Sequence, residues 1–186
     1  MIQCFQQGKV EINMLVYHGS NNLFTEFDYS RMGTTGTGEG QGFYFTDSLE
    51  VANMYSEKGG YIYECEFLGK KSLNSEKINL KRSEIKKVLL ALHSEADILW
   101  DWEDIGAYGL NKVLNIAIEN VMTCKSDVDI YGGLCNSTGD TKLVAETFYK
   151  VLGYDSIVTK VAYGNNHTVY VATIPDVIKI IKVTQK

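Results

Sequence analysis

The chain has 186 residues, of which 45% are hydrophobic and 22% are charged, and this is enough apolar material for the core of one globular unit. Its 18 basic and 23 acidic residues leave a net charge of −5, which repels a polyphosphate backbone and argues against general nucleic-acid binding. No apolar run approaches the length of a membrane span, and no basic start is followed by an apolar core. We therefore expect a cytoplasmic protein with no membrane partner.

The residues most often used to bind transition metals are few in this chain: Cys4, Cys65, Cys124, Cys135, His18, His93 and His167. The cysteines form no Cys-x-x-Cys pair, and none stands at a metal-ligand spacing from a histidine. We expect no metal site, and thiols that stay reduced in the cytoplasm.

The start of the chain divides into an extension and a patterned region. Residues 1–13 are polar and show no pattern, so the sequence predicts an N-terminal extension there and a single domain at 14–186. Alternation and turn residues then predict a strand at 14–18, a glycine-rich loop at 33–42, a strand at 43–46, a helix at 48–57 and a strand at 61–67.

The middle of the chain, about 70–143, is predicted to be a helical insert. Apolar residues recur at spacings of three and four, which predicts helices at 83–92, 109–122 and 141–152. Ser83 is placed to cap the first of these helices.

Two stretches of this insert have a composition that suggests binding. Basic residues gather between Lys70 and Lys87, and we favour a solvated helix face over a nucleic-acid patch. The acidic segment 97–104 holds both tryptophans, and we favour packing on the core over a partner surface.

Tyr17-His18-Gly19-Ser20 ends the first predicted strand. An apolar run precedes His18 and a polar turn follows it, so we expect its side chain to be aimed at a cleft. Gly19 has no Cβ, which lets a ligand approach the backbone and use its N–H and C=O as a donor and acceptor pair. A primary carboxamide needs such a pair.

The segment Gly40–Asp47 supplies aromatic rings. Alternation along the strand places Tyr44 on the face opposite Phe43 and Phe45, which pack inward. The helical pattern that follows returns Tyr55 to the same slot. A His-Gly-Ser or a Gly-x-Gly alone is more often structural, but together and in this order they predict a slot for a flat, polar ring.

In combination these motifs resemble those of the His-Tyr-Glu group of ADP-ribosyltransferases, the fold shared by poly(ADP-ribose) polymerases and diphtheria-type toxins. In that group one strand carries His-Gly-Ser, and a later strand carries Gly-x-Tyr-Phe, followed by a helix with a second tyrosine. The segment from Gly153 to Lys179 is similar to the closing strands of ADP-ribosyltransferase-like domains in phage and mobile-element polyvalent proteins.

The resemblance implies that NAD is bound as the substrate. His18 would hydrogen-bond its nicotinamide-ribose and adenosine side, while Gly19, next to Ser20, would clamp the carboxamide. Tyr44 and Tyr55 would sandwich the nicotinamide ring.

Two further features are interpreted through this resemblance. The loop at 33–42 lacks the Gly-Lys-Ser/Thr ending of a P-loop, so we expect a mobile lid over the NAD cleft, with Arg31 reaching the pyrophosphate. Ala52 falls where the polymerases carry a serine that also binds the carboxamide, and one hydrogen bond of about 1 kcal/mol would be missing.

The glutamate of the family is the main departure. Its place falls at His167 or Thr168, and neither is a carboxylate able to stabilise the charge that builds as nicotinamide leaves. Some relatives with an apolar residue at this place still transfer a single ADP-ribose, so the missing glutamate argues against chain elongation more strongly than against all transfer. Asp155 is a nearby carboxylate, but its turn setting favours bonding to its own backbone.

We thus expect an α+β fold with two small, mostly antiparallel sheets around an NAD cleft and a helical insert. The expected activity is mono-ADP-ribosyl transfer to a macromolecule, a protein more than a nucleic acid, by an effector, toxin or host-defence inhibitor of a bacterium or its mobile elements. The alternatives are a non-catalytic module of this fold that binds NAD or a protein, and an NAD glycohydrolase.

Overall fold

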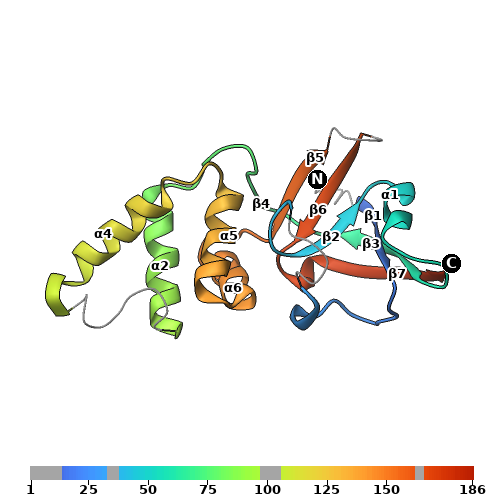
Figure 1. Cartoon of the computed structure of the whole chain (residues 1–186), viewed down its shortest axis with the longest axis horizontal. Coiled ribbons are helices and arrows are strands. Elements are labelled where there is room, and N and C mark those ends of the chain that lie inside the picture. The colour runs from blue at the N-terminus through green and yellow to red at the C-terminus, as the bar shows by residue number, and fades with distance from the viewer. Residues whose placement is uncertain (1–13, 33–37, 97–105, 162–165) are drawn as a thin grey trace, which may run out of the picture.

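A computed structural model describes residues 14–32, 38–96, 106–161 and 166–186. One mixed sheet forms one side of the molecule, and most of the helices gather on the other (Figure 1). The strands are β1 (Met14–Ser20), β2 (Phe43–Thr46), β3 (Tyr61–Phe67), β4 (Ser72–Leu73), β5 (Ser156–Val161), β6 (His167–Ala172) and β7 (Ile178–Gln185). The helices are α1 (Leu49–Met54), α2 (Arg82–Ala96), α4 (Leu110–Val121), α5 (Asp127–Thr138) and α6 (Thr141–Leu152), with short 3-10 helices η1 (Tyr29–Arg31) and η2 (Pro175–Val177).

The sheet has the order β4-β5-β6-β2-β1-β3-β7, and its pairs are antiparallel except for β4 with β5. The prediction of two sheets is therefore wrong, because the described strands form one sheet. Between the described strands β1 and β2 the register contains one pair, Tyr17 with Thr46, whereas β1 and β3 pair along seven residues. The one sheet thus has two halves, β4-β5-β6-β2 and β1-β3-β7, which are joined at a narrow bridge between β2 and β1.

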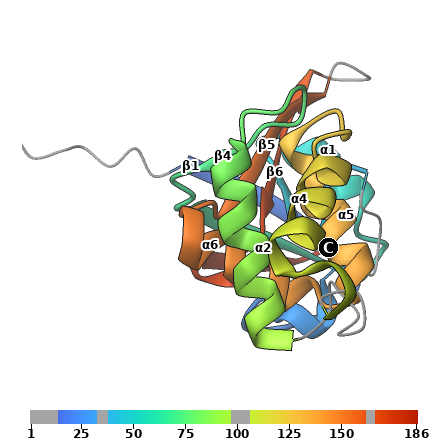
Figure 2. The same cartoon turned by 90° about the vertical axis from the view of Figure 1, so that its left-hand side faces the viewer.

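Two hydrophobic clusters cover the two faces of the sheet. One joins the sheet to the helices, with Ile157 and Val171 packed among residues of α2, α4, α5 and α6. In Figure 1 α5 and α6 lie next to the sheet and α2 and α4 lie farther out, and Figure 2 shows α2 and α4 in front of it. The second cluster, which contains Phe43, Phe45 and Tyr63, is closed by Phe24 and Phe27 from the segment after β1.

Several predicted elements are confirmed. The strands at 43–46 and 61–67 and the helix at 141–152 have the predicted bounds. The helix predicted at 83–92 begins at Arg82, so Ser83 is not its cap. The Glu84 carboxylate instead accepts a hydrogen bond from the Lys81 N–H at 2.8 Å, which satisfies one donor of the first turn.

The sequence pattern does not predict helix α5, because Gly132 and Gly133 interrupt its apolar pattern and lower its helix propensity. Its first turn is fixed by the Ser126 side chain, which accepts from the Asp129 N–H. The buried Asp127 carboxylate accepts from the N–H groups of Asn79 and Leu80 at 2.8 and 2.9 Å. This carboxylate ties the start of α5 to the loop before α2.

No helix in the described part of the chain is long and apolar enough to cross a membrane.

Candidate functional site

His18, Gly19 and Tyr44 lie where the halves of the sheet join. Beyond the Tyr17–Thr46 pair, continuation of the register would set Gly19 opposite Tyr44, but these described residues are not paired. His18 bridges the gap instead: its Nδ1 lies 2.7 Å from the carbonyl oxygen of Tyr44. One side chain therefore links β1 to β2 just where main-chain pairing stops.

The protonation state of His18 follows from this contact. A carbonyl oxygen only accepts, so Nδ1 holds the proton, and Nε2 is the acceptor of the neutral ring. Burial lowers the pKa of His18 below its usual value, and the hydrogen bond to Tyr44 only partly opposes this effect. The ring is thus neutral near pH 7, with Nε2 able to accept a hydrogen bond from a hydroxyl group.

The surroundings of His18 correct one expectation. Instead of standing at an open strand end, the ring packs among aromatic side chains, with centroid distances of 5.3 Å to Phe27, 5.6 Å to Phe45 and 6.0 Å to Tyr63. Phe24 closes the same cluster at 6.0 Å. His18 therefore contributes to packing as well as to the link between β1 and β2.

The neutral, partly buried state of His18 predicts a dependence of stability on pH. The unfolded chain takes up a proton near pH 6.5 and the folded chain does so only at lower pH, so the free energy of unfolding should be constant above about pH 6.5 and fall as the pH drops below it. Urea titrations between about pH 8 and pH 5 measure this slope. His18→Phe keeps an aromatic ring and should flatten the slope; an unchanged slope in this variant would contradict the assignment.

A glycine is needed at position 19 because α1 and its C-cap lie where a side chain would be. A Cβ at this position would lie 3.1 Å from the carbonyl carbon of Ala52, closer still to its oxygen, and 3.2 Å from the carbonyl carbon of Tyr55. The missing side chain at Gly19 thus makes room for α1, which packs directly on the β1 backbone; the expected contact of the Gly19 N–H and C=O with a ligand stays a prediction. Ala52 is only 1% exposed, at this contact.

Tyr44 and Tyr55 occupy the two elements expected. Phe43 and Phe45 are buried in the second cluster, while Tyr44 packs toward the helix side of the sheet, so the predicted alternation is confirmed. The Tyr44 hydroxyl donates to the Gly40 carbonyl at 2.5 Å and accepts from the Glu39 N–H at 3.2 Å. The end of the glycine-rich loop is thereby fixed to this ring.

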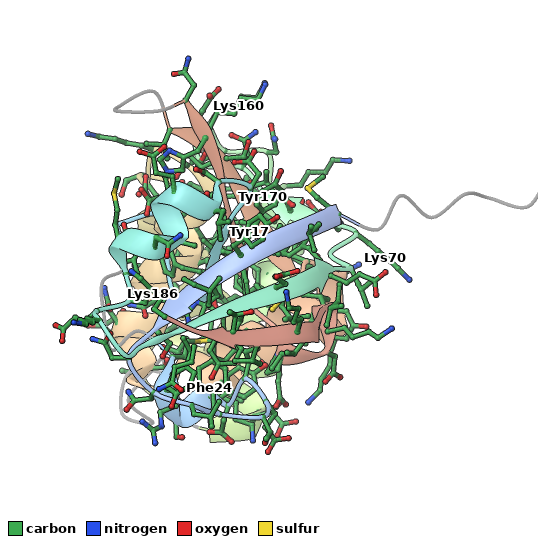
Figure 3. All side chains as sticks on the ribbon, turned by 90° about the vertical axis from the view of Figure 1, so that its right-hand side faces the viewer. Tyr17, Phe24, Lys70, Lys160, Tyr170 and Lys186 are labelled. Carbon is green, nitrogen blue, oxygen red and sulfur yellow. The ribbon has the colours of Figure 1, made fainter. Side chains whose placement is uncertain are left out.

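Burial raises the pKa of Tyr44 to about 12; the hydrogen bond from the Glu39 N–H opposes this effect in part, and the charges of Glu39 and Tyr55 add to it. Tyr55 forms the C-cap of α1 and is 66% exposed. The Lys186 ammonium donates to the carbonyls of Asn53 and Ser56 at 3.0 and 2.8 Å, which fixes the turn that holds Tyr55. Figure 3 shows Lys186 beside α1.

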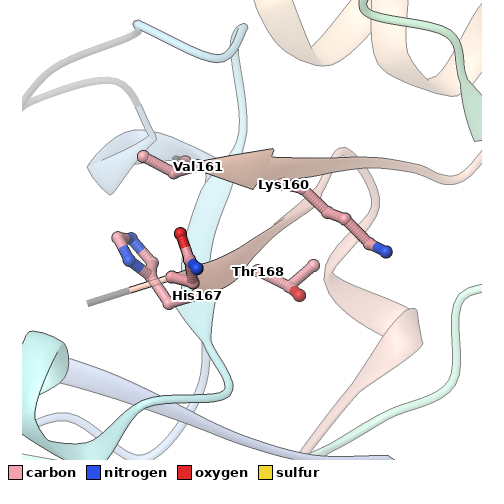
Figure 4. A pocket seen from close by; sticks show the side chains of 5 residues that line it. Lys160, Val161, His167 and Thr168 are labelled. Atoms are coloured by element: carbon pink, nitrogen blue, oxygen red, sulfur yellow. The ribbon is translucent and has the colours of Figure 1, made fainter. Parts of the chain in front are cut away.

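His167 and Thr168, the two places considered for the missing glutamate, begin β6. With Lys160, Val161 and Asn166 they line a hollow of about 470 Å³ (Figure 4). Tyr44 pairs with Val171 and Thr46 with Val169, so alternation places His167 on the face of Tyr44 and Thr168 on the other face. In Figure 4 the His167 and Thr168 side chains point to opposite sides.

Asp155 has a structural role. It is 3% exposed, and its carboxylate accepts from the N–H groups of Lys70 and Lys71 at 2.9 and 3.1 Å and from the Ser156 hydroxyl at 2.8 Å. These bonds occupy both oxygens and tie β5 to the segment after β3. The structural role expected for Asp155 is confirmed, but its carboxylate binds the distant N–H groups of Lys70 and Lys71 and the adjacent Ser156 hydroxyl rather than the backbone of its own turn.

The remaining predicted residues are less informative. Ser20 ends β1, and its hydroxyl accepts from the Asn22 N–H at 3.1 Å, which shapes the following turn. Arg31 is exposed at the end of η1. Most of the expected lid, 33–37, and the acidic segment at 97–104 lie outside the described residues, as does the extension at 1–13. Within the described ranges no group of three or more His, Cys, Asp or Glu side chains is arranged to hold a metal ion.

These observations define an α+β domain with a histidine, a glycine and two tyrosines gathered where the halves of its sheet join. The chain belongs to the family described as ADP-ribosyltransferase in polyvalent proteins, whose family model matches residues 12–185. The resemblance found in the sequence is thereby confirmed, and the family supports ADP-ribosylation as the general activity. Comparisons with curated proteins and with solved structures find no match.

Proposed function

We propose that the domain binds NAD at the join between β1 and β2 and transfers a single ADP-ribose to a macromolecule. The observation that supports this most is the bond from His18 to the Tyr44 carbonyl, because it holds together the two strands that would supply the nicotinamide slot. Gly19, Tyr44 and Tyr55 lie around the same point.

Each of these residues has a task that its chemistry suits. Tyr44 and Tyr55 stack on the two faces of nicotinamide, and the Gly19 backbone donates to and accepts from its carboxamide. The His18 Nε2 accepts a hydrogen bond from a ribose hydroxyl, since Nδ1 is already used as the donor to Tyr44. Arg31 is proposed to reach the pyrophosphate, and Ser20 to shape the turn beside the carboxamide.

Transfer requires the bond between ribose C1′ and the nicotinamide nitrogen to break, with its electron pair leaving on nicotinamide. The ribose then carries positive charge until an acceptor oxygen or nitrogen bonds to C1′ and gives up its proton. The family's glutamate is replaced by His167 or Thr168, so we propose transfer of one unit rather than growth of a chain. A protein acceptor is favoured over a nucleic acid because the chain is acidic, with a net charge of −5.

We place this activity in an effector, toxin or host-defence inhibitor encoded by a phage or another mobile element, which acts in the bacterial cytoplasm. The alternatives are hydrolysis of NAD without an acceptor and a module that binds NAD without reaction. The purified domain is incubated with labelled NAD and a bacterial lysate, then analysed for nicotinamide and for labelled macromolecules. Nicotinamide with label supports transfer, nicotinamide without label supports hydrolysis, and bound but intact NAD supports the binding module.

The face assignment of β6 gives a sharper test of the catalytic step. His167→Glu places a carboxylate on the face of Tyr44, so nicotinamide release should rise several-fold or more, because fixed charge near a developing opposite charge lowers the barrier. Thr168→Glu adds the same charge on the other face and serves as the matched control. An equal rise in both variants, or none in either while NAD still binds, would contradict the assignment.

A further inference from the structure

The turn after α1 is held by two side chains that come from distant parts of the chain. Asn21, in the segment after β1, accepts a hydrogen bond at its Oδ1 from the Glu57 N–H at 2.7 Å. Lys186, which follows β7, donates from its ammonium to the carbonyls of Asn53 and Ser56 at 3.0 and 2.8 Å. We call these two side chains, Asn21 and Lys186, the clamp.

The clamp replaces the hydrogen bond that would continue α1. In a longer helix the Glu57 N–H would donate to the Asn53 carbonyl, four residues earlier. Here that N–H donates to Asn21, and the carbonyl accepts from Lys186 in addition to a longer contact of 3.5 Å with the Ser56 hydroxyl. The clamp therefore satisfies a donor and an acceptor that the end of the helix leaves open, and it fixes where α1 stops.

The main chain around the clamp adds further links. The Gly60 N–H donates to the Glu57 carbonyl at 2.9 Å, and the Gly60 carbonyl accepts from the Lys186 N–H at 2.9 Å. A Cβ at Gly60 would lie only 2.8 Å from the carbonyl oxygen of Ser20, so the turn lies directly against the residue that follows Gly19. The turn is thus tied both to the end of β1 and to the end of β7.

Tyr55 is the residue whose position the clamp controls. It is the C-cap of α1 and stands between Asn53 and Ser56, and its carbonyl carbon lies 3.2 Å from the place of a Cβ at Gly19. Its side chain is 66% exposed, so packing alone does not fix the ring. The ring lies close enough to Tyr44 for the two hydroxyl groups to interact electrostatically. Its place relative to Gly19 and Tyr44 therefore depends on the backbone that the clamp holds.

We propose that Asn21 and Lys186 are positioning residues for NAD, which act through Tyr55 and do not touch the dinucleotide. This inference rests on the proposed function, in which Tyr55 covers one face of nicotinamide. Without the clamp the end of α1 opens locally, and the Tyr55 ring loses its fixed place over nicotinamide. Because the clamp acts through one ring, its removal should cost no more affinity than removal of that ring.

Lys186→Met tests the clamp, since it keeps the length of the side chain and removes the ammonium. The affinity for NAD, measured by calorimetry, should fall about three- to ten-fold, where the upper bound is the loss expected for Tyr55→Ala. Lys182→Met is the matched control. It removes another exposed lysine of β7, which pairs with Glu64 and not with α1, and should leave the affinity unchanged.

Conservative variants separate the hydrogen bonds from other effects of substitution. Lys186→Arg keeps a cation able to donate to two carbonyls, and Asn21→Asp keeps an oxygen that accepts from the Glu57 N–H. Both proteins should bind NAD within about two-fold of the unmodified protein. Asn21→Ala lacks the acceptor and should weaken binding as Lys186→Met does.

A double-mutant cycle with Tyr55→Ala tests whether the clamp acts through the ring. In a protein that already carries Tyr55→Ala, Lys186→Met should cause no further loss of affinity. A loss of the same size in both backgrounds overturns the proposal, because a general structural effect does not depend on Tyr55. Unchanged affinity in Lys186→Met, an equal loss in Lys182→Met, or a Lys186→Met protein that does not fold also overturns it.

The affinities of the unmodified protein and of Tyr55→Ala keep the two proposals apart. If the unmodified protein does not bind NAD, or if Tyr55→Ala binds it equally well, the proposed slot fails and the positioning role fails with it. If Tyr55→Ala weakens binding and Lys186→Met does not, only the positioning role fails and the slot remains.

Discussion

Gly19→Ala is expected to abolish NAD binding and to destabilise the protein. The added Cβ would overlap the backbone of Ala52 and approach that of Tyr55, and these main-chain atoms are held by α1 and by Lys186, so they cannot turn aside as a flexible side chain would. Overpacking of this kind costs about 1–3 kcal/mol, and any relief must move α1 away from β1. Thermal melting measures the loss of stability, and calorimetry with NAD measures the loss of binding.

Gly133→Ala is the matched control. Gly133 lies in α5 with nothing within 4 Å of an added Cβ, and alanine is the better helix former by up to about 1 kcal/mol. This variant should melt at the same or a higher temperature and bind NAD normally. A Gly19→Ala protein with normal stability and NAD affinity would show that α1 does not rest on β1 as described.

Removing the two stacking rings is expected to weaken NAD binding about a hundred-fold. Each offset stack contributes about 0.5–1.5 kcal/mol beyond the area that it buries, so Tyr44→Ala or Tyr55→Ala alone should cost about ten-fold. The double variant should combine the two losses, since each ring covers a different face of nicotinamide. Calorimetry with NAD measures all three affinities.

Tyr44→Phe is the control for the ring itself. It keeps the stacking face and removes the hydroxyl that binds Gly40 and Glu39, so NAD affinity should change far less than in Tyr44→Ala. An equal loss in Tyr44→Phe would assign the effect to the loop rather than to stacking. Unchanged affinity in Tyr44→Ala, with the protein folded, would exclude the slot.

The elements that sequence patterns predicted well have local causes. The strand at 43–46 alternates a half-buried Tyr44 with buried neighbours, and the helix at 141–152 has one apolar face, an Asp140 cap and a C-cap at Gly153 in the left-handed region. His18, Gly19, Tyr44 and Tyr55 were predicted to meet, and the structure brings their elements together at the join of β1 and β2.

The features that sequence patterns missed depend on distant contacts. Phe24 and Phe27 close over His18 from a segment without regular structure, and no periodicity indicates this. Asp155 binds N–H groups at Lys70 and Lys71, more than 80 positions away. Asp47 contacts Thr168, which lies 121 positions later in the chain. The residues around Asp47 are typical of a segment before a helix cap and do not indicate this contact.

The measurement that tests the central claim most directly is the calorimetric affinity for NAD, followed in the same samples by nicotinamide release, for the unmodified domain and for Tyr44→Ala. We expect saturable binding at one site and slow release of nicotinamide. In Tyr44→Ala the NAD affinity should fall about ten-fold, and nicotinamide release should fall with it, while the melting transition is preserved. An unmodified, folded domain that neither binds NAD nor releases nicotinamide, or one whose NAD handling is unaffected by Tyr44→Ala, would contradict an NAD site at the join of β1 and β2.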